Sequence, residues 1–175
     1  MNQRALWVAI PVGIIAALFV GVLAASDPGA GRSGSNLVGD LAPQMVAVDA
    51  SGEPFDLDQL RGRWVVVNFF ATWCAPCVQE HPQLVAFVDQ ADPAEVAVVS
   101  IAFNDTPDNV ASFFADNGGD WPVLLEESLA IDWAVAQVPE SFIVAPNGRV
   151  AAHVTGGVEA EELERAIVEL GGGAA

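Results

Sequence analysis

The residue types and spacing that best fit covalent chemistry are those of Cys74 and Cys77, three positions apart and the only two cysteines among 175 residues. Without a third or fourth partner, they can form a disulfide only with each other. The apolar run 64–70 before them predicts a buried parallel strand, and residues 78–90 after them predict a helix. Free backbone N–H groups and the helix dipole at such a junction favour a thiolate on Cys74. The pattern predicts a redox-active dithiol.

Two other roles for the cysteine pair fit the sequence less well. A zinc site needs about four ligands. Only His81 and His153 could complete one. His81 lies four residues after Cys77 on the same helical face, but His153 lies on a distant predicted strand. A purely structural disulfide is the other alternative, but closing so short a loop removes little chain entropy from the unfolded state.

Three neighbours of the cysteines have candidate roles. Cys74 should attack a substrate disulfide, and Cys77 should resolve the mixed disulfide that forms. Glu80 lies three residues after Cys77, close enough along a helix to take the Cys77 proton. A carboxylate there could instead stabilise the first helical turn through the dipole. Pro76 has no N–H to stabilise the thiolate, which suits a reductant. Trp73 is either an exposed apolar contact for partners or a packing residue.

The elements that must position these residues alternate between strands and helices. Residues 44–48 and 53–57 predict a hairpin, and the glycines at 118 and 119 predict the end of a helix over 108–117. The remaining elements are expected as strands at 95–103, 121–125, 141–145 and 149–155, and helices at 128–136 and 159–170. This order predicts an α/β sandwich around a mixed sheet.

The N-terminal region predicts export. Residues 6–25 contain no charged side chain and are long enough to span a bilayer, with Arg4 before them on the cytoplasmic side. Residues 1–25 are therefore expected to be an uncleaved membrane anchor, the alternative being a cleaved signal sequence. Residues 26–36 have the composition of a flexible linker, 37–171 form one redox domain, and 172–175 are expected to be a disordered tail.

The net charge of −17 argues against nucleic-acid binding and against attraction to anionic lipid headgroups. Such acidity fits partners with basic surfaces, and apocytochromes with a haem-binding Cys-x-x-Cys-His segment would be suitable. A salt-adapted or acidic proteome would have the same composition.

Residues 68–77, Asn-Phe-Phe-Ala-Thr-Trp-Cys-Ala-Pro-Cys, resemble the active-site segment of thioredoxin-fold proteins, in particular the membrane-tethered TlpA/ResA/DsbE (CcmG) family. The resemblance spans about residues 37–170, and further matches lie at 37–43, 56–63 and 138–142. It implies a thioredoxin-like three-layer α/β sandwich with a central mixed β-sheet and an N-terminal β-hairpin extension, preceded by one transmembrane helix.

The resemblance also implies roles for individual residues. Glu80 falls where the family has an active-site glutamate, and Pro82 matches the proline that kinks the first helix of such folds. Pro139 matches the family's cis-proline, and Val138 before it would pair with an extended substrate backbone as an added strand. Thioredoxin has a buried aspartate where this chain has Asn68, so Glu80 is the candidate for proton handling.

The function implied is that of an extracytoplasmic thiol–disulfide oxidoreductase held at the cell membrane by a single span. Its expected reaction is reduction of apocytochrome c or other exported protein disulfides by the Cys74–Cys77 couple, without any other cofactor or metal. The family implies that electrons arrive from a membrane transporter related to CcdA or DsbD.

Other functions remain open. A general disulfide oxidant or isomerase would use the same pair, whereas the context of Cys74 does not match a peroxiredoxin. A copper chaperone could use Cys74, Cys77 and His153, although His153 is otherwise interpreted as structural. A tethered binding module would need the disulfide only for shape. Glu140, next to Pro139, could bias the site electrostatically or be a solvated carboxylate.

Overall fold

The computed structural model describes residues 37–171. The predicted anchor or signal sequence at 1–25, the linker at 26–36 and the tail at 172–175 lie outside the described residues. Within 37–171, no helix is both long enough and apolar enough to cross a membrane.

A five-stranded mixed sheet forms the middle of the domain, with strand order β5-β4-β3-β6-β7. The central strand β3 runs parallel to β4 and antiparallel to β6, while β4 and β5 are parallel and β6 and β7 antiparallel. The strands are β3 (Trp64–Phe70), β4 (Val96–Ala102), β5 (Val123–Leu124), β6 (Glu140–Val144) and β7 (Val150–Thr155). Every residue of β3 is buried, which explains why all of them except Asn68 are apolar.

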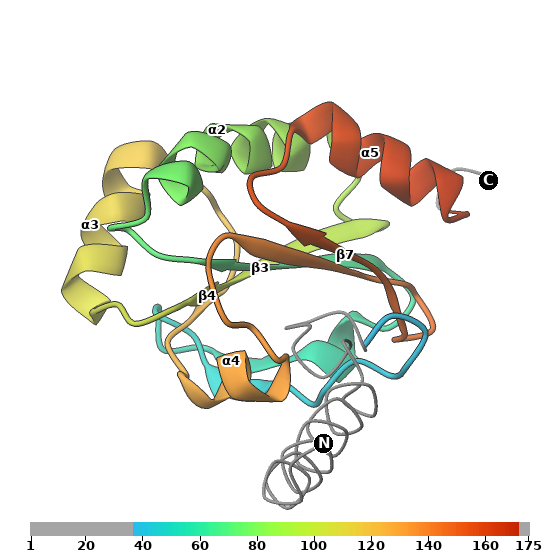
Figure 1. The fold of residues 1–175 in the computed structure, drawn as a ribbon, viewed down its shortest axis with the longest axis horizontal. Helices are drawn as coiled ribbons and strands as arrows, with labels where there is room; N and C mark the ends of the chain where they lie inside the picture. Colours follow the sequence, from blue (N-terminus) through green and yellow to red (C-terminus); the bar gives the residue numbers. More distant parts are fainter. Residues whose placement is uncertain (1–36, 172–175) are drawn as a thin grey trace, which may run out of the picture. The chain divides into compact units, whose positions relative to one another are not determined.

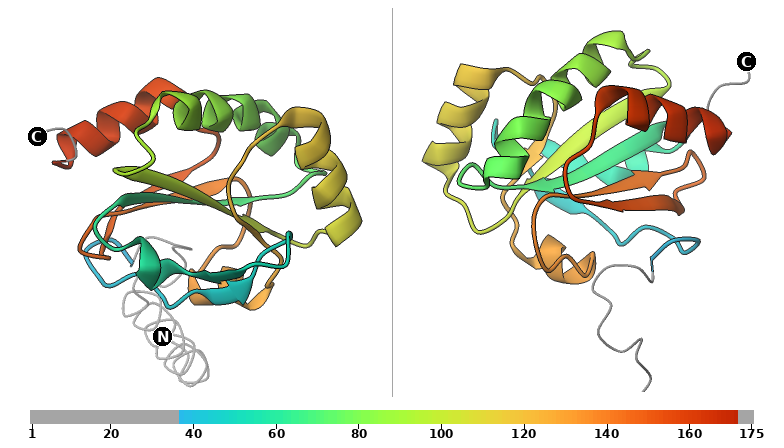
Figure 2. Two further views of the ribbon diagram at one scale, coloured as in Figure 1. Left: turned by 180° about the vertical axis from the view of Figure 1, so that it is seen from behind. Right: turned by 45° about the horizontal axis from the view of Figure 1, so that its top comes forward.

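Helices cover one face of this sheet, and a mixed layer covers the other (Figure 1). The helical layer contains α2 (Ala75–Gln90), α3 (Pro107–Asn117) and α5 (Ala160–Glu169). The opposite layer contains the hairpin of β1 (Val46–Val48) and β2 (Pro54–Asp56), the 3-10 helix η1 (Leu57–Leu60) and α4 (Ser128–Asp132). Figure 2 shows the same layers from behind and with the top turned forward. The predicted three-layer sandwich and its hairpin extension are confirmed.

Two apolar cores follow from the alternation of side chains along β3. Val65, Val67 and Phe69 face the hairpin and α4, in a cluster that includes Trp133. Trp64 and Val66 face the helices and pack in a second cluster with Leu84, Phe87, Leu163 and Ile167. Phe70 packs beside the two cysteines in a third, smaller cluster. Asn68 belongs to this alternating set, so the fold places a polar side chain under α2.

The predicted strand at 64–70 is confirmed, but several other boundaries differ from the prediction. The helix expected from residue 78 begins at Ala75, because Cys74 serves as its N-cap residue. The helix expected over 128–136 ends at Asp132, since Ala134 has a φ of 52°, which a continuing helix does not permit. The strand expected at 121–125 contains only Val123–Leu124. Pro82 lies inside α2, as the resemblance implies.

Candidate active site

The two cysteines form a disulfide at the beginning of α2. Their Cα atoms are 5.2 Å apart, and Cys77 lies in the first turn of the helix. The Cys77 backbone N–H points to the Cys74 sulfur, at an N-to-S distance of 3.3 Å. This N–H and the helix dipole would stabilise a thiolate on Cys74 after reduction. The predicted pairing at a helix N-terminus is confirmed.

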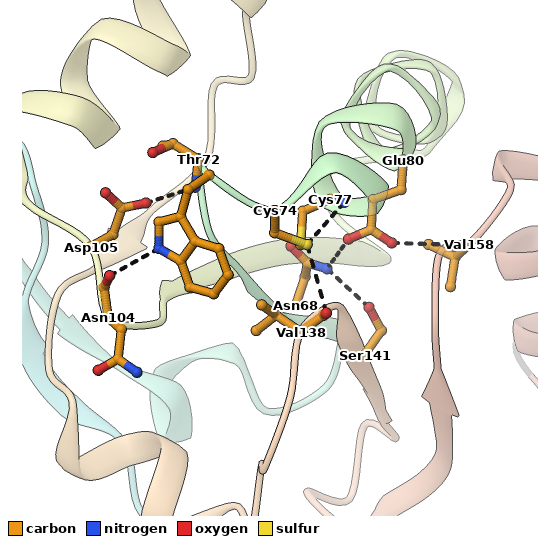
Figure 3. The surroundings of a disulfide bond; sticks show 11 residues. Asn68, Thr72, Cys74, Cys77, Glu80, Asn104, Asp105, Val138, Ser141 and Val158 are labelled. Atoms are coloured by element: carbon orange, nitrogen blue, oxygen red, sulfur yellow. Dashed lines mark hydrogen bonds between the residues drawn. A yellow bond between two sulfur atoms is a disulfide. The ribbon is translucent and has the colours of Figure 1, made fainter.

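The loop before β6 lies against the disulfide (Figure 3). The carbonyl oxygen of Val138 is 3.6 Å from the Cys74 sulfur, and the Val138–Pro139 peptide bond is cis, as the resemblance implies. The Pro139 carbonyl accepts a hydrogen bond of 2.9 Å from the Gly156 N–H, which ties the loop to the end of β7. Two segments more than 60 residues apart therefore meet at one sulfur atom.

Glu80 is buried beneath the first turns of α2, with 3% of its surface exposed. One carboxylate oxygen accepts a hydrogen bond of 2.8 Å from the Asn68 side-chain amide, and the other accepts one of 3.1 Å from the Val158 backbone N–H. Burial raises the pKa of Glu80 to about 7, against the lowering effect of these two donors. A carboxyl group with this pKa can both take up and release a proton near neutral pH.

Asn68 is the centre of a row of polar side chains that crosses the middle of the sheet. It pairs in register with Ser100 on β4 and with Ser141 on β6, and all three residues are buried. Its amide nitrogen also donates to the Ser141 hydroxyl, at 3.1 Å (Figure 3). The sequence analysis gave neither serine a role at the site; Ser100 is the one polar residue of the run 96–102, and Ser141 begins the otherwise apolar stretch 141–145.

The segment before the disulfide is held by the loop after β4. The Thr72 N–H donates to the Asp105 carboxylate at 2.6 Å, and the Trp73 indole N–H donates to the Asn104 carbonyl at 3.0 Å. Burial tends to raise the pKa of Asp105, but hydrogen bonds from Thr72, Thr106 and Asn109 lower it below its usual value. Trp73 keeps 60% of its surface exposed beside Cys74, so its ring remains available to a partner. Asp105 was not singled out from the sequence.

Glu140 and His153 form a buried pair behind the cis-proline loop. The Glu140 carboxylate lies 2.8 Å from the His153 ring nitrogen Nε2, and the imidazole stacks on Phe142, with ring centroids 4.2 Å apart. Glu140 is 1% exposed, so the alternative of a solvated carboxylate is wrong. The structural interpretation of His153 agrees with these contacts.

The histidines proposed as metal ligands are held elsewhere. The His81 ring nitrogen Nε2 lies 2.9 Å from the Gly118 carbonyl oxygen, among the rings of Phe113, Phe114 and Trp121. His153 is paired with Glu140. Across residues 37–171, no three His, Cys, Asp or Glu side chains come together in a way that could hold a metal ion. The zinc and copper alternatives therefore have no ligand set in this part of the chain.

The fold and the position of the disulfide define the class of this protein. A Cys-x-x-Cys disulfide that heads the helix after the central strand, against a cis-proline loop, belongs to the thioredoxin-like thiol–disulfide oxidoreductases. Within that class, the chain belongs to the AhpC/TSA family, whose model matches residues 38–153.

Individual relatives agree with this membership. The chain is 33% identical over 144 residues to the thiol:disulfide interchange protein HelX of Rhodobacter capsulatus, covering 79% of this chain and 80% of HelX. It is 29% identical over 129 residues to the thiol-disulfide oxidoreductase ResA of Bacillus thuringiensis, covering 73% and 75%. A crystal structure of a thiol:disulfide interchange protein of the thioredoxin family from Chlorobium tepidum superposes with a TM-score of 0.69 at 28% identity, covering 78% and 99%. The resemblance to the TlpA/ResA/DsbE family is confirmed.

The raised pKa of Glu80 should make the oxidised protein less stable as the pH rises. Between about pH 4.5 and 7 the unfolded chain ionises Glu80 while the folded protein keeps it protonated, so the free energy of unfolding should fall by about 3 kcal/mol across this window. The lowered pKa of His81 acts in the opposite direction, so the contribution of Glu80 must be isolated by difference. Glutamine resembles the protonated carboxyl group, so the free energies of unfolding of wild type and Glu80→Gln, measured by denaturant unfolding, should be similar near pH 4.5 and should separate toward pH 7, as the wild type alone loses stability. Parallel curves would contradict the prediction.

Proposed function

We propose that this protein is an extracytoplasmic reductase that keeps the cysteines of exported proteins, apocytochrome c in particular, in the thiol form. The observation that carries the proposal is a buried carboxyl group with a pKa of about 7, held one helical turn after the resolving cysteine. The names of HelX and ResA support the redox reaction, and the absence of an N–H at Pro76 supports the reducing direction.

The proposed reaction balances two electrons and two protons. The Cys74 thiolate attacks a substrate disulfide and releases the first substrate sulfur as a thiolate, which takes up a proton. Cys77 gives its proton to Glu80 and attacks the Cys74 sulfur, which closes the Cys74–Cys77 disulfide and releases the second substrate sulfur as a thiolate. This thiolate takes up the second proton, and Glu80 returns its proton to the solvent. Cys74 is assigned the attack because it is the more exposed of the pair, at 6% against 2%.

The same proposal includes location and partners. The apolar segment at 6–25 would anchor the chain, and residues 26–36 would let the redox domain reach substrates near the membrane. Because each turnover leaves the disulfide form, electrons must be supplied in an oxidising compartment, and a CcdA or DsbD type of transporter would supply them. The Cys74–Cys77 couple needs no other cofactor for this exchange.

The test is the reduction potential of the Cys74–Cys77 couple, measured on the full-length protein in mild detergent against dithiol buffers of known potential. A value near or below that of thioredoxin, about −270 mV, would support a reductase. A value near that of DsbA, about −120 mV, would overturn the direction and support the alternative of a general disulfide oxidant.

Trp73→Ala should weaken the protein's activity on protein substrates without affecting its reaction with small disulfides. The exposed ring beside Cys74 offers a large apolar contact, and its loss should raise KM about fivefold to tenfold for a peptide disulfide. Steady-state kinetics with a peptide and with a small aromatic disulfide would separate the two effects. Trp73→Phe, which keeps a ring, is the matched control. An equal loss with both substrates would instead indicate a distorted site.

A further inference from the structure

A chain of hydrogen bonds links Glu80 to Trp121, which lies on the same, helical face of the sheet, in contact with His81 and Phe114. The Trp121 indole nitrogen is 2.8 Å from the Ser100 hydroxyl, and this hydroxyl is 3.5 Å from the Asn68 carbonyl oxygen. The Asn68 amide nitrogen is 2.8 Å from the Glu80 carboxylate. Ser100, Asn68 and Glu80 are each at most 3% exposed, whereas Trp121 is half-buried. Four side chains, from β3, β4, α2 and the segment before β5, therefore form one connection.

Every donor in this connection points toward Glu80. An indole can only donate, so the Ser100 oxygen accepts from Trp121 and its own hydrogen is directed to Asn68. A carboxylate can only accept, so the Asn68 amide nitrogen must face Glu80 and its oxygen must face Ser100. Hydrogen bonds aligned in one direction polarise one another, and the polarisation strengthens the last donor. The alignment favours negative charge on Glu80.

We propose that Ser100 and Trp121 are positioning residues for thiol–disulfide exchange, which act through Asn68 to hold Glu80 in place and in its ionised form beside Cys77. The inference rests on the proposed function, because it assumes that Glu80 takes the Cys77 proton. It extends the site across the sheet, to β4 and to the segment before β5. Apolar side chains in place of Asn68 and Ser100 would fill the same space without the free-energy cost of burying polar groups, so packing alone does not explain these two residues.

Other titratable groups around Glu80 are few. Cys77 lies one turn earlier on α2, and His81 follows Glu80 but is bonded to Gly118. On the strands, Glu140 and His153 are bonded to each other. Next to α5, Glu159 is exposed. In the oxidised protein the cysteines do not titrate, so a pH-dependent change in the NMR chemical shift of the Glu80 carboxyl carbon reports the protonation of Glu80 itself.

The experiment follows the Glu80 side-chain carboxyl carbon by NMR from pH 5 to 9 in the oxidised full-length protein, with the signal assigned by its loss in Glu80→Gln. The variants are Ser100→Ala and Trp121→Phe. Ser100→Ala removes the hydroxyl that bonds to both Trp121 and Asn68, and Trp121→Phe removes only the indole N–H that donates to Ser100. Ser100→Thr keeps the hydroxyl as a conservative rescue. Trp133→Phe is the matched control, because the buried Trp133 N–H has no hydrogen-bond partner among residues 37–171. A second readout is the pH dependence of the second thionitrobenzoate release when the reduced protein reacts with dithionitrobenzoate.

Interrupting this chain of hydrogen bonds should raise the pH midpoint of the Glu80 titration from about 7 by about half a unit. The reason is that the Asn68 amide, once less polarised, stabilises the carboxylate less. The pH midpoint of the rate of the second thionitrobenzoate release should rise by the same amount. In Ser100→Thr and Trp133→Phe, both midpoints should stay at the wild-type values. Unchanged carboxyl titration in both Ser100→Ala and Trp121→Phe would overturn the inference, as would a shifted titration with an unchanged rate profile. A wild-type protein with no second release would instead disprove the proposed function, and the carboxyl titration would still decide whether the chain acts on Glu80. If Ser100→Ala does not fold, the half-buried Trp121→Phe decides the outcome.

Discussion

Cys77→Ser should accumulate a stable mixed disulfide between Cys74 and a substrate cysteine, and its turnover should fall by at least about three orders of magnitude. The first attack needs only Cys74, whose sulfur already has the Cys77 backbone N–H and the helix N-terminus beside it. The second step needs a thiol at residue 77, and no other cysteine exists in the chain to replace it. Non-reducing electrophoresis and mass spectrometry after incubation with an oxidised Cys-x-x-Cys-His peptide would identify the adduct.

Cys74→Ser is the matched variant, and it should neither form the adduct nor turn over. The same mixed disulfide on Cys77 in this variant would reverse the assigned roles. Full complementation of a deletion strain by the double variant, with both cysteines replaced by serine, would support the tethered binding module and exclude an enzymatic role for the pair.

Glu80→Gln should slow the second step about a hundredfold at pH 7 and above, because the Cys77 proton then has no positioned acceptor. In the wild type, Glu80 is ionised above a pKa of about 7 and protonated below it, so the rate of thionitrobenzoate release should rise through this pH. Glutamine cannot ionise, so that inflection should disappear and only the titration of the thiol should remain. Stopped-flow reaction of the reduced protein with dithionitrobenzoate, from pH 5 to 9, measures both features.

Glu159→Gln provides the control for charge. Glu159 precedes α5, is exposed, and makes no side-chain cap hydrogen bond, so its replacement removes one negative charge without touching the site. Glu159→Gln should leave the pH profile of thionitrobenzoate release unchanged. A Glu80→Gln variant with the wild-type rate at every pH would reduce Glu80 to the alternative role of stabilising the first helical turn.

The class of fold and the chemical pair could be predicted from the sequence because both depend on local patterns. The run at 64–70, apolar except for Asn68, and the cysteine spacing are each contained within ten residues, and the order of strands and helices follows from periodicity. Boundaries were less predictable where a single residue decides them. Cys74 caps α2 with its sulfur, and Ala134 ends α4 with a left-handed conformation.

The environment of the disulfide depended on tertiary structure, because strand register brings together residues that are distant in the chain. Asn68 meets residues 32 and 73 positions away through the pairing of β3 with β4 and β6. Glu80 acquires its second donor from Val158, 78 residues further on. The sequence by itself determined that two cysteines would form a redox couple at a helix N-terminus. Only the packing of the sheet against α2 decided the burial and hydrogen-bond partners of Glu80, because a pKa depends on desolvation and on nearby donors, and both are created when distant segments pack together.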